Sequence, residues 1–490
     1  MKNETLMQYF EWDLPADSLL WKRCMAQAPK LKAAGITKVW LPPAYKGMNG
    51  VADVGYGVYD VYDLGEFDQK GSIATKYGTK EEYLQAVKEF QKNGIEVLAD
   101  VVLNHMMGAD ACESVRAIEI AENNRNQSMG SVKEISAWTV FNFPGRKSKY
   151  SDFTWNKTHF NGVDWDDAAK RKALYLFDGK HWDGETDEEK ANYDYLMGAD
   201  LDMENAEVRA QLIKWGLWYE KTVGMDGFRL DAVKHINTSF YKKWIRALRE
   251  QTGKDLFAVA EYWHADLKRL LRYLDGIENA FSLFDVPLHF NFYNASQQGG
   301  TFDMRYLLDN TLVEHRSENA VTFVDNHDTQ PGQALCSFVQ SWFKPLAYAC
   351  ILLRKEGLPC VFYGDYYGLP SHNITPLRGL RKLIKIRELY AYGEQKDYFD
   401  HENIVGWVRM GDKEHKNSGL AVLLSDGPGG NKRMFIGKEF SGMEFMDTTG
   451  KCLAPVVIDE EGWGCFGVDG GSVSVWVCKE AYIYLETELE

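Results

Sequence analysis

Three acidic residues each follow an apolar segment of strand length and stand among other polar side chains. They are Asp231 in GFRLDAVKH (227–235), Glu261 in FAVAEYW (257–263) and Asp328 in VTFVDNHDT (321–329). A single carboxylate at such a place is most often a solvated loop acid or a helix cap. Three of them, each beside an Arg, a His or a Trp, instead indicate a catalytic centre.

The surroundings of these acids predict different roles for them. Arg229 and Asp231 are two residues apart in a strand and share a face, so the Arg charge favours the ionised form of Asp231, as a nucleophile requires. Glu261 lies between an apolar strand and two aromatic residues, which raises its pKa and suits a general acid. Such a pair is what cleavage of a glycosidic bond requires. Asp328, behind His327, is expected to bind sugar hydroxyls and support the transition state.

Eight short apolar segments, most of them followed by an amphipathic stretch of helix length, would have to position these residues. This pattern predicts βα units and an α/β fold, a closed (β/α)8 TIM barrel with catalytic groups at the carboxyl ends of its strands. The expected strands are 5–10, 36–41, 95–102, 227–230, 256–260, 280–284, 320–324 and 359–363.

Two parts of the chain depart from this pattern. The gap after the third strand is too long for one crossover helix, so we expect an inserted subdomain over residues 104–205. After a predicted helix at 378–393, the pattern changes to alternation with turn signals, typical of an antiparallel β-sandwich. The predicted division is therefore barrel (1–103), insert (104–205), barrel (206–393) and C-terminal β domain (394–490).

Composition excludes several classes of protein. The formal net charge is 56 − 71 = −15, which disfavours nucleic acid and anionic membranes as partners. The longest apolar run, at 345–353, is far shorter than a membrane span. The first residues do not resemble a signal peptide, so we expect a cytoplasmic protein unless a leader has been removed. The eight cysteines form no CxxC pair and predict reduced, buried thiols.

Four short motifs resemble those of one enzyme family: DVVLNH (100–105), GFRLDAVKH, VAEYW (259–263) and FVDNHD (323–328). In order and placement they resemble α-amylases of glycoside hydrolase family 13, most closely the bacterial liquefying and cytoplasmic ones. The resemblance implies Asp231 as nucleophile, Glu261 as acid/base and Asp328 as transition-state stabiliser. It further implies a set of substrate-binding residues: Tyr56, His105, Arg229, Lys234, His235, Trp263 and His327. For these, a packing or hydrogen-bonding role is the alternative.

The segment 181–205 carries nine acidic residues and one Lys. Its composition is equally compatible with a solvated face and with a site for a hard cation. The resemblance favours calcium, held by Asn104, Asp194, Asp200 and the backbone carbonyl of His235. Extracellular relatives hold more cations at positions equivalent to Asp183, Asp202 and Glu204. Here Asn161 replaces an Asp, which weakens the case for additional ions.

We therefore expect an endo-acting, retaining α-amylase that hydrolyses internal α-1,4 bonds of starch, glycogen or maltodextrins, as a monomer with one structural calcium ion. Within the family, an α-glucanotransferase is the alternative, because sugar can replace water as the acceptor. A glucan-binding protein without turnover is the alternative from another class. It should lack the nucleophile or the acid, and both are present.

Overall fold

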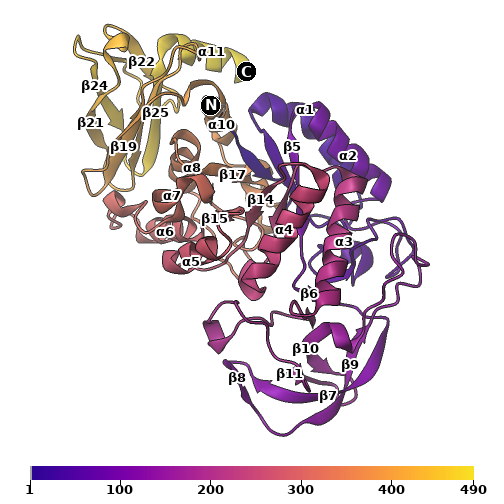
Figure 1. The fold of residues 1–490 in the computed structure, drawn as a ribbon. Helices are drawn as coiled ribbons and strands as arrows, with labels where there is room; N and C mark the ends of the chain where they lie inside the picture. The colour runs from indigo at the N-terminus through magenta and orange to yellow at the C-terminus, as the bar shows by residue number, and fades with distance from the viewer. Residues whose placement is uncertain (1–2, 490) are drawn as a thin grey trace.

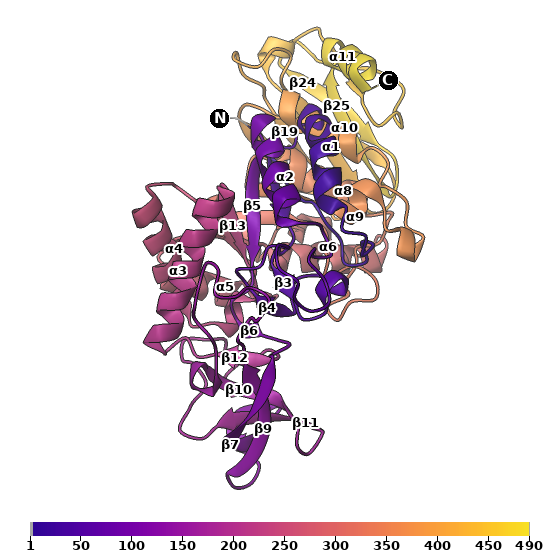
Figure 2. The same ribbon diagram turned by 90° about the vertical axis from the view of Figure 1, so that its right-hand side faces the viewer.

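The computed structural model describes residues 3–489, which form three bodies in a row (Figures 1 and 2). A barrel lies in the middle, a β-rich insert at one end and a C-terminal β domain at the other. None of the helices within these residues combines the length and apolar character that a membrane crossing demands.

All eight predicted barrel strands are present. They close in the order β1-β17-β16-β15-β14-β13-β5-β2 with parallel pairing throughout, so the predicted (β/α)8 barrel is confirmed. Their bounds are β1 Leu6–Gln8, β2 Lys38–Leu41, β5 Glu96–Val101, β13 Gly227–Leu230, β14 Phe257–Ala260, β15 Ser282–Phe284, β16 Ala320–Phe323 and β17 Leu358–Phe362.

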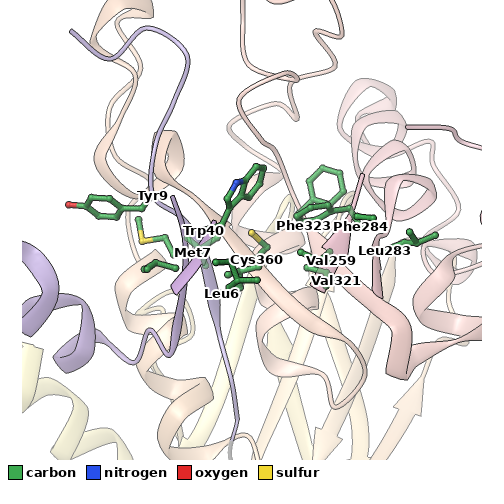
Figure 3. Packing of buried hydrophobic residues seen from close by; sticks show 14 of the residues in the cluster. Leu6, Met7, Tyr9, Trp40, Val259, Leu283, Phe284, Val321, Phe323 and Cys360 are labelled. Carbon is green, nitrogen blue, oxygen red and sulfur yellow. The ribbon is translucent and has the colours of Figure 1, made fainter. Parts of the chain in front are cut away.

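Helices cover the outside of the barrel. They are α1 Leu20–Ala34, α2 Lys80–Lys92, α3 Ala206–Val223, α4 Thr238–Thr252, α5 Leu267–Gly276, α6 Val286–Gln298, α7 Leu312–His315, α8 Lys344–Leu353, α9 Tyr363–Tyr367 and α10 Leu380–Tyr390. Apolar side chains from β1, β2, β14, β15, β16 and β17 pack against one another in the close-up of Figure 3. This packing fixes the strand ends that carry the predicted acids.

Helix α4 shows how sequence pattern sets the outer surface. Its buried residues recur at helical spacing and face the barrel: Phe240, Tyr241, Trp244, Ile245 and Leu248. Gly216 on α3 allows this close approach, since a Cβ there would lie 2.8 Å from the Trp244 ring. The same pattern leaves Lys243 and Arg246 on the outward side.

The insert is built around one antiparallel sheet with the order β6-β12-β10-β11-β7-β8, and β9 pairs with β7. Its strands are β6 His105–Met106, β7 Ala111–Ala121, β8 Asn124–Ser128, β9 Lys133–Val140, β10 Phe160–Asp166, β11 Arg171–Phe177 and β12 Ala199–Leu201. The first and last of these strands pair with each other, which closes the insert beside the barrel. The strands fall within 104–205, and those limits remain a prediction.

The C-terminal domain has two antiparallel layers, as predicted. A six-stranded sheet has the order β18-β19-β20-β25-β22-β23, and the ribbon β21–β24 contacts it. The bounds are β18 Gln395–Tyr398, β19 Ile404–Arg409, β20 Leu420–Ser425, β21 Gly430–Phe435, β22 Glu444–Asp447, β23 Val456–Val457, β24 Trp463–Val468 and β25 Ser472–Cys478. The sequence did not predict the final helix α11 (Lys479–Leu489), which packs through Ala481 and Leu485, four residues apart.

All eight cysteines are unpaired, as expected, but the prediction that they are buried is only half right. Cys24, Cys350, Cys360 and Cys478 are buried, whereas Cys336 and Cys465 are exposed and the other two are partly exposed. The exposed pair lie in a loop and on the two-stranded ribbon, where no helix layer covers them.

Candidate active site and metal site

The predicted catalytic and substrate-binding residues converge on one cleft at the carboxyl ends of the barrel strands. This cleft has a volume of about 380 Å³. Nine of the ten predicted residues line it: Tyr56, His105, Asp231, Lys234, His235, Glu261, Trp263, His327 and Asp328. The tenth, Arg229, is buried on β13 and hydrogen-bonds to two of the acids.

Arg229 joins three carboxylates from neighbouring strands. Its guanidinium donates to Asp100 Oδ1 at 2.9 Å and to Asp231 Oδ1 at 2.6 Å. It also donates to Glu261 Oε2. These four residues, which we call the barrel cluster, are buried, so the one internal cation offsets much of the cost of burying the acids.

The electrostatics of the acids differ. Burial, together with the charges of Asp231 and Asp328, raises the pKa of Glu261 from 4.5 to about 8 against the opposing effect of Arg229. Burial also raises the pKa of Asp328 to about 7. The expected shift of Glu261 is thus confirmed, with burial as its main cause. At neutral pH the cleft presents a protonated Glu261 close to Asp231, which Arg229 holds in an ion pair.

Aromatic rings form one wall of the cleft. The Trp12 and Tyr56 rings are nearly parallel, with centroids 5.8 Å apart and planes at 1°, and the His327 ring lies 5.1 Å from Tyr56 at 11°. The Tyr56 hydroxyl donates to Asp100 Oδ2 at 2.9 Å, which fixes the ring. Flat aromatic faces of this kind suit the apolar faces of sugar rings.

Two of the three predicted substrate-binding histidines, His105 and His327, are held by neighbouring polar groups. His105 Nε2 lies 2.9 Å from the Tyr56 carbonyl, and His327 Nδ1 lies 3.0 Å from the Gln8 amide nitrogen. Burial lowers the pKa of both rings, so they are neutral at physiological pH.

On the other side of the cleft, Lys234 pairs with Glu189 at 2.8 Å and His235 Nδ1 lies 2.7 Å from the Tyr193 carbonyl. Glu189 and Tyr193 belong to the insert. The insert therefore reaches the cleft, since Tyr193 lines it and Glu189 pairs with the lining residue Lys234.

Several cleft residues were not predicted. Trp12 precedes the first helix and carries no motif, and Tyr193, Leu196, Met197 and Gln333 come from loops whose path the sequence does not define. Asp100 stands in the quoted motif DVVLNH but received no role. Its period-two relation to Leu98 and Asn104 could have placed it on the inner face of β5.

A second group of acids lies in the insert. Asp183 and Asp194 both accept hydrogen bonds from the Asn161 amide, each at 3.2 Å, and Asp200 is buried nearby. We call these four residues the insert cluster. Burial raises the pKa of Asp183 to about 6, and burial together with the neighbouring acids raises the pKa of Asp194 and Asp200 well above its usual value.

The predicted calcium ligands are brought near one another. Asp200 on β12 is the register partner of His105, next to Asn104, and His235 contacts the carbonyl of Tyr193, next to Asp194. Asp200 Oδ2 and Asn104 Nδ2 are buried and have no hydrogen-bond partner within residues 3–489. The orphaned Asp200 oxygen among surplus carboxylates fits a hard cation. No three His, Cys, Asp or Glu side chains in the described chain are assembled into metal-ligating geometry.

Two of the acids at the positions of further cations in extracellular relatives, Asp202 and Glu204, are paired with basic side chains. Asp202 accepts from Lys180, and Glu204 Oε2 lies 2.8 Å from His181 Nε2. Both acids already have a basic partner, so only Asp183 remains beside the expected calcium ligands.

Two carboxyls in different electrostatic surroundings at the mouth of a TIM barrel are typical of a glycoside hydrolase. Comparison with known proteins gives the family. Residues 25–404 match the family description "Alpha amylase, catalytic domain", and residues 420–477 match "Alpha-amylase C-terminal". The chain therefore belongs to the α-amylase family, whose members cleave α-1,4-glucosidic bonds with retention of configuration.

Individual relatives cover nearly the whole chain. An α-amylase of Geobacillus stearothermophilus is 54% identical over 98% of this chain and 88% of its own length. A cytoplasmic α-amylase of Escherichia coli is 42% identical over 98% of this chain and 100% of its own length. A crystal structure of an Anoxybacillus α-amylase shares the fold, with a TM-score of 0.65, 17% identity and 97% coverage of both chains.

Proposed function

We propose that this enzyme cleaves internal α-1,4 bonds of starch, glycogen or maltodextrins, with Asp231 as nucleophile and Glu261 as acid/base. The observation that carries the assignment is the contrast within the barrel cluster. Arg229 pairs with both Asp231 and Glu261, yet burial and the neighbouring acids still raise the pKa of Glu261 to about 8. One carboxyl is thereby suited to attack and the other to deliver a proton.

The reaction takes two displacements. Protonated Glu261 gives its proton to the glycosidic oxygen while Asp231 attacks the anomeric carbon, which releases the leaving chain and forms a glycosyl ester. Ionised Glu261 then takes a proton from water, and the water oxygen attacks the same carbon and frees Asp231. Asp328, beside His327, supports the charge that develops on the sugar ring. Two inversions give net retention.

The decisive experiment uses a maltoheptaose blocked at its non-reducing end. The wild type should cut it internally and release first products in the α-configuration, resolved by NMR before mutarotation. Glu261→Gln should keep the fold and lower turnover by about 10²-fold or more. Near-wild-type turnover of this variant, a β-configured first product, or cleavage only after unblocking would reject the assignment. Elongated products would instead favour the transferase alternative.

We also propose that one calcium ion is held by Asn104, Asp194, Asp200 and the His235 carbonyl. The ion would supply charge neutralisation and a tie between the insert and the barrel, with no part in bond cleavage. The orphaned carboxylate oxygen of Asp200, beside the raised pKa values of Asp194 and Asp200, supports this site. Elemental analysis of active enzyme should find about one calcium per chain, and none would contradict the proposal.

We propose that the enzyme works in the cytoplasm and that it is a monomer. Eight unpaired cysteines support a reducing compartment. Fractionation of the source cells should place the enzyme in the soluble fraction, and light scattering should give the mass of one chain, 56.0 kDa. Enzyme found in the medium, or twice that mass, would contradict these two points.

A further inference from the structure

A second hollow lies outside the catalytic cleft, between helices α4 and α5 and the insert loop at 185–188. Its volume is about 610 Å³, within the range of small-ligand sites. Two backbone hydrogen bonds secure the loop: Thr238 N donates to the Glu185 carbonyl at 3.1 Å, and Asp187 N to the Lys234 carbonyl at 2.9 Å. Figure 1 shows α4 and α5 beside each other on the outer layer of the barrel. We call this hollow the basic groove.

The charge of the basic groove is opposite to that of the whole molecule. Six cations line it: Lys234, Lys242, Lys243, Arg246, Arg269 and Arg272. Three acids line it as well, which gives 6 − 3 = +3 in a chain of net charge −15. An anionic ligand that the rest of the surface repels would be attracted here.

The acids of the groove are already engaged. Asp187 accepts from the Tyr262 hydroxyl and from Arg269. Glu188 pairs with Arg272 at 3.3 Å, with both side chains largely exposed. Two of the three groove acids are thus paired with cations. The third, Glu185, accepts a hydrogen bond from the Ser239 backbone N–H at 3.2 Å, and its charge is included in the net +3.

Three of the cations, Lys242, Lys243 and Arg246, are only weakly held, whereas Lys234 and Arg269 pair with less exposed acids. Lys242 pairs with Glu278 and Arg246 with Glu250, acids whose side chains are 75% and 62% exposed. Exposed ion pairs contribute little, so a multivalent anion can compete for their cations. Lys243 contacts only a hydroxyl, Ser239 Oγ at 3.4 Å, among the hydrogen bonds of the described chain.

Neutral donors complete the lining. Tyr273 is 5% exposed, and its hydroxyl is buried without a hydrogen-bond partner within residues 3–489. A buried hydroxyl without a partner needs an explanation, and a ligand in the groove supplies one. Thr238 and Ser239 begin the 15-residue helix α4, whose N-terminus favours negative charge.

We propose that the basic groove binds a phosphate monoester of glucose, either a free hexose phosphate or a phosphorylated unit of a glucan. Three Arg side chains offer the planar donors that match phosphate oxygens, and the hydroxyl-bearing residues can bond the sugar. Lys234 lines both the groove and the catalytic cleft, so a glucan in the cleft could extend toward the groove. The sugar part of this inference rests on the proposed function.

Calorimetry on the full chain tests the site, with Glu261→Gln as background so that no ligand is consumed. At low ionic strength, glucose 6-phosphate should bind at least about tenfold more tightly than glucose or inorganic phosphate. The double variant Arg246→Gln/Arg272→Gln should weaken this binding by at least about tenfold. The matched control Lys133→Gln/Arg171→Gln removes the same charge from exposed pairs in the insert and should not change it.

A second pair of ligands distinguishes the sources. If phosphorylated maltodextrin binds more tightly than its phosphatase-treated form, the ligand is a phosphorylated unit of a glucan. If the two forms bind equally, the ligand is the free hexose phosphate. The proposal is overturned if glucose 6-phosphate binds no better than glucose or inorganic phosphate. It is also overturned if both double variants bind glucose 6-phosphate like the background protein. Since binding is measured without turnover, an error in the catalytic roles leaves this result intact.

Discussion

The barrel cluster and the insert cluster solve the same physical problem in different ways. Each buries three carboxylates around one nitrogen-bearing side chain. In the barrel that side chain is Arg229, which donates to Asp100, Asp231 and Glu261 and carries a full positive charge. In the insert it is Asn161, which donates to two acids and carries none.

This difference implies that the chain itself supplies a counter-charge in the barrel cluster and none in the insert cluster. Burying an unpaired charge is costly, so the insert acids either hold protons, as the raised pKa values of Asp194 and Asp200 indicate, or hold a cation from solution. The barrel cluster can therefore serve chemistry without an ion, whereas the insert cluster links folding to one.

Removing the internal cation should have the largest effect. Arg229→Gln leaves three buried carboxylates without a counter-charge, and the free energy of unfolding should fall by about 3–5 kcal/mol, measured by denaturant titration. The control Arg171→Gln breaks an exposed pair with Glu119 and should cost less than about 1 kcal/mol. Equal losses in the two variants would contradict the role assigned to Arg229.

Removing calcium from the insert cluster should have the second-largest effect. At free calcium of about a thousand times the dissociation constant, chelation should lower the free energy of unfolding by about 4 kcal/mol. Asp200→Ala should have a similar effect without a chelator, and added calcium should restore stability only in part. Thermal melting followed by calorimetry measures both effects.

The pH dependence of the chelated protein provides the control for that experiment. Asp183 has a folded-state pKa of about 6 against an ordinary 3.8, so the folded state binds more protons than the unfolded state in this window. Stability of the chelated protein should therefore fall as pH rises from about 4 to 6. Calcium displaces those protons and should flatten the decline. Identical profiles with and without calcium would argue against the site.

Adding charge to the insert should produce a smaller change. Asn161→Asp places a fourth carboxylate in the insert cluster, so calcium should bind roughly tenfold more tightly while the chelated protein becomes less stable. Asn126→Asp makes the same change at an exposed position of the insert and should alter neither quantity. Calcium titrations of both variants measure the affinity, and equal affinities would contradict the prediction.

The last prediction concerns activity instead of stability, and it involves only the barrel cluster. Glu261 must be protonated to act as the acid, and its pKa is about 8, so kcat/KM should be halved near pH 8 and fall tenfold per unit above it. An aryl maltoside, whose leaving group needs no proton, should show a much weaker alkaline loss. A loss centred near pH 5 would assign the titration to another group.

Much of the barrel could be predicted because its signals are local. Arg229 and Asp231 share a strand face by the two-residue period, and an apolar strand before Glu261 already implies a raised pKa. The number of barrel strands followed from the recurring apolar runs and the helix-length stretches that come after them. The resemblance supplied the roles of Tyr56, His105 and Lys234, which periodicity alone does not.

Other parts depend on contacts between distant segments. Trp12 stacks on Tyr56, 44 residues away, through a loop that carries no pattern. Asp100 meets Arg229 because the register of β5 and β13 places the two residues side by side, and the sequence does not give this register. The helix α11 was missed because its short amphipathic pattern directly follows the strongly alternating strand β25.

Barrel closure also has a consequence for synthesis on the ribosome. Leu6 in β1 pairs with Lys38 soon after both emerge, but with Cys360 only after a further 360 − 38 = 322 residues. At about 5–20 residues per second this takes roughly 16–64 s. During that time β1, whose residues are all buried in the finished protein, presents an apolar open edge. The nascent chain is therefore most exposed to mispairing at its first strand, and the last barrel strand ends that exposure.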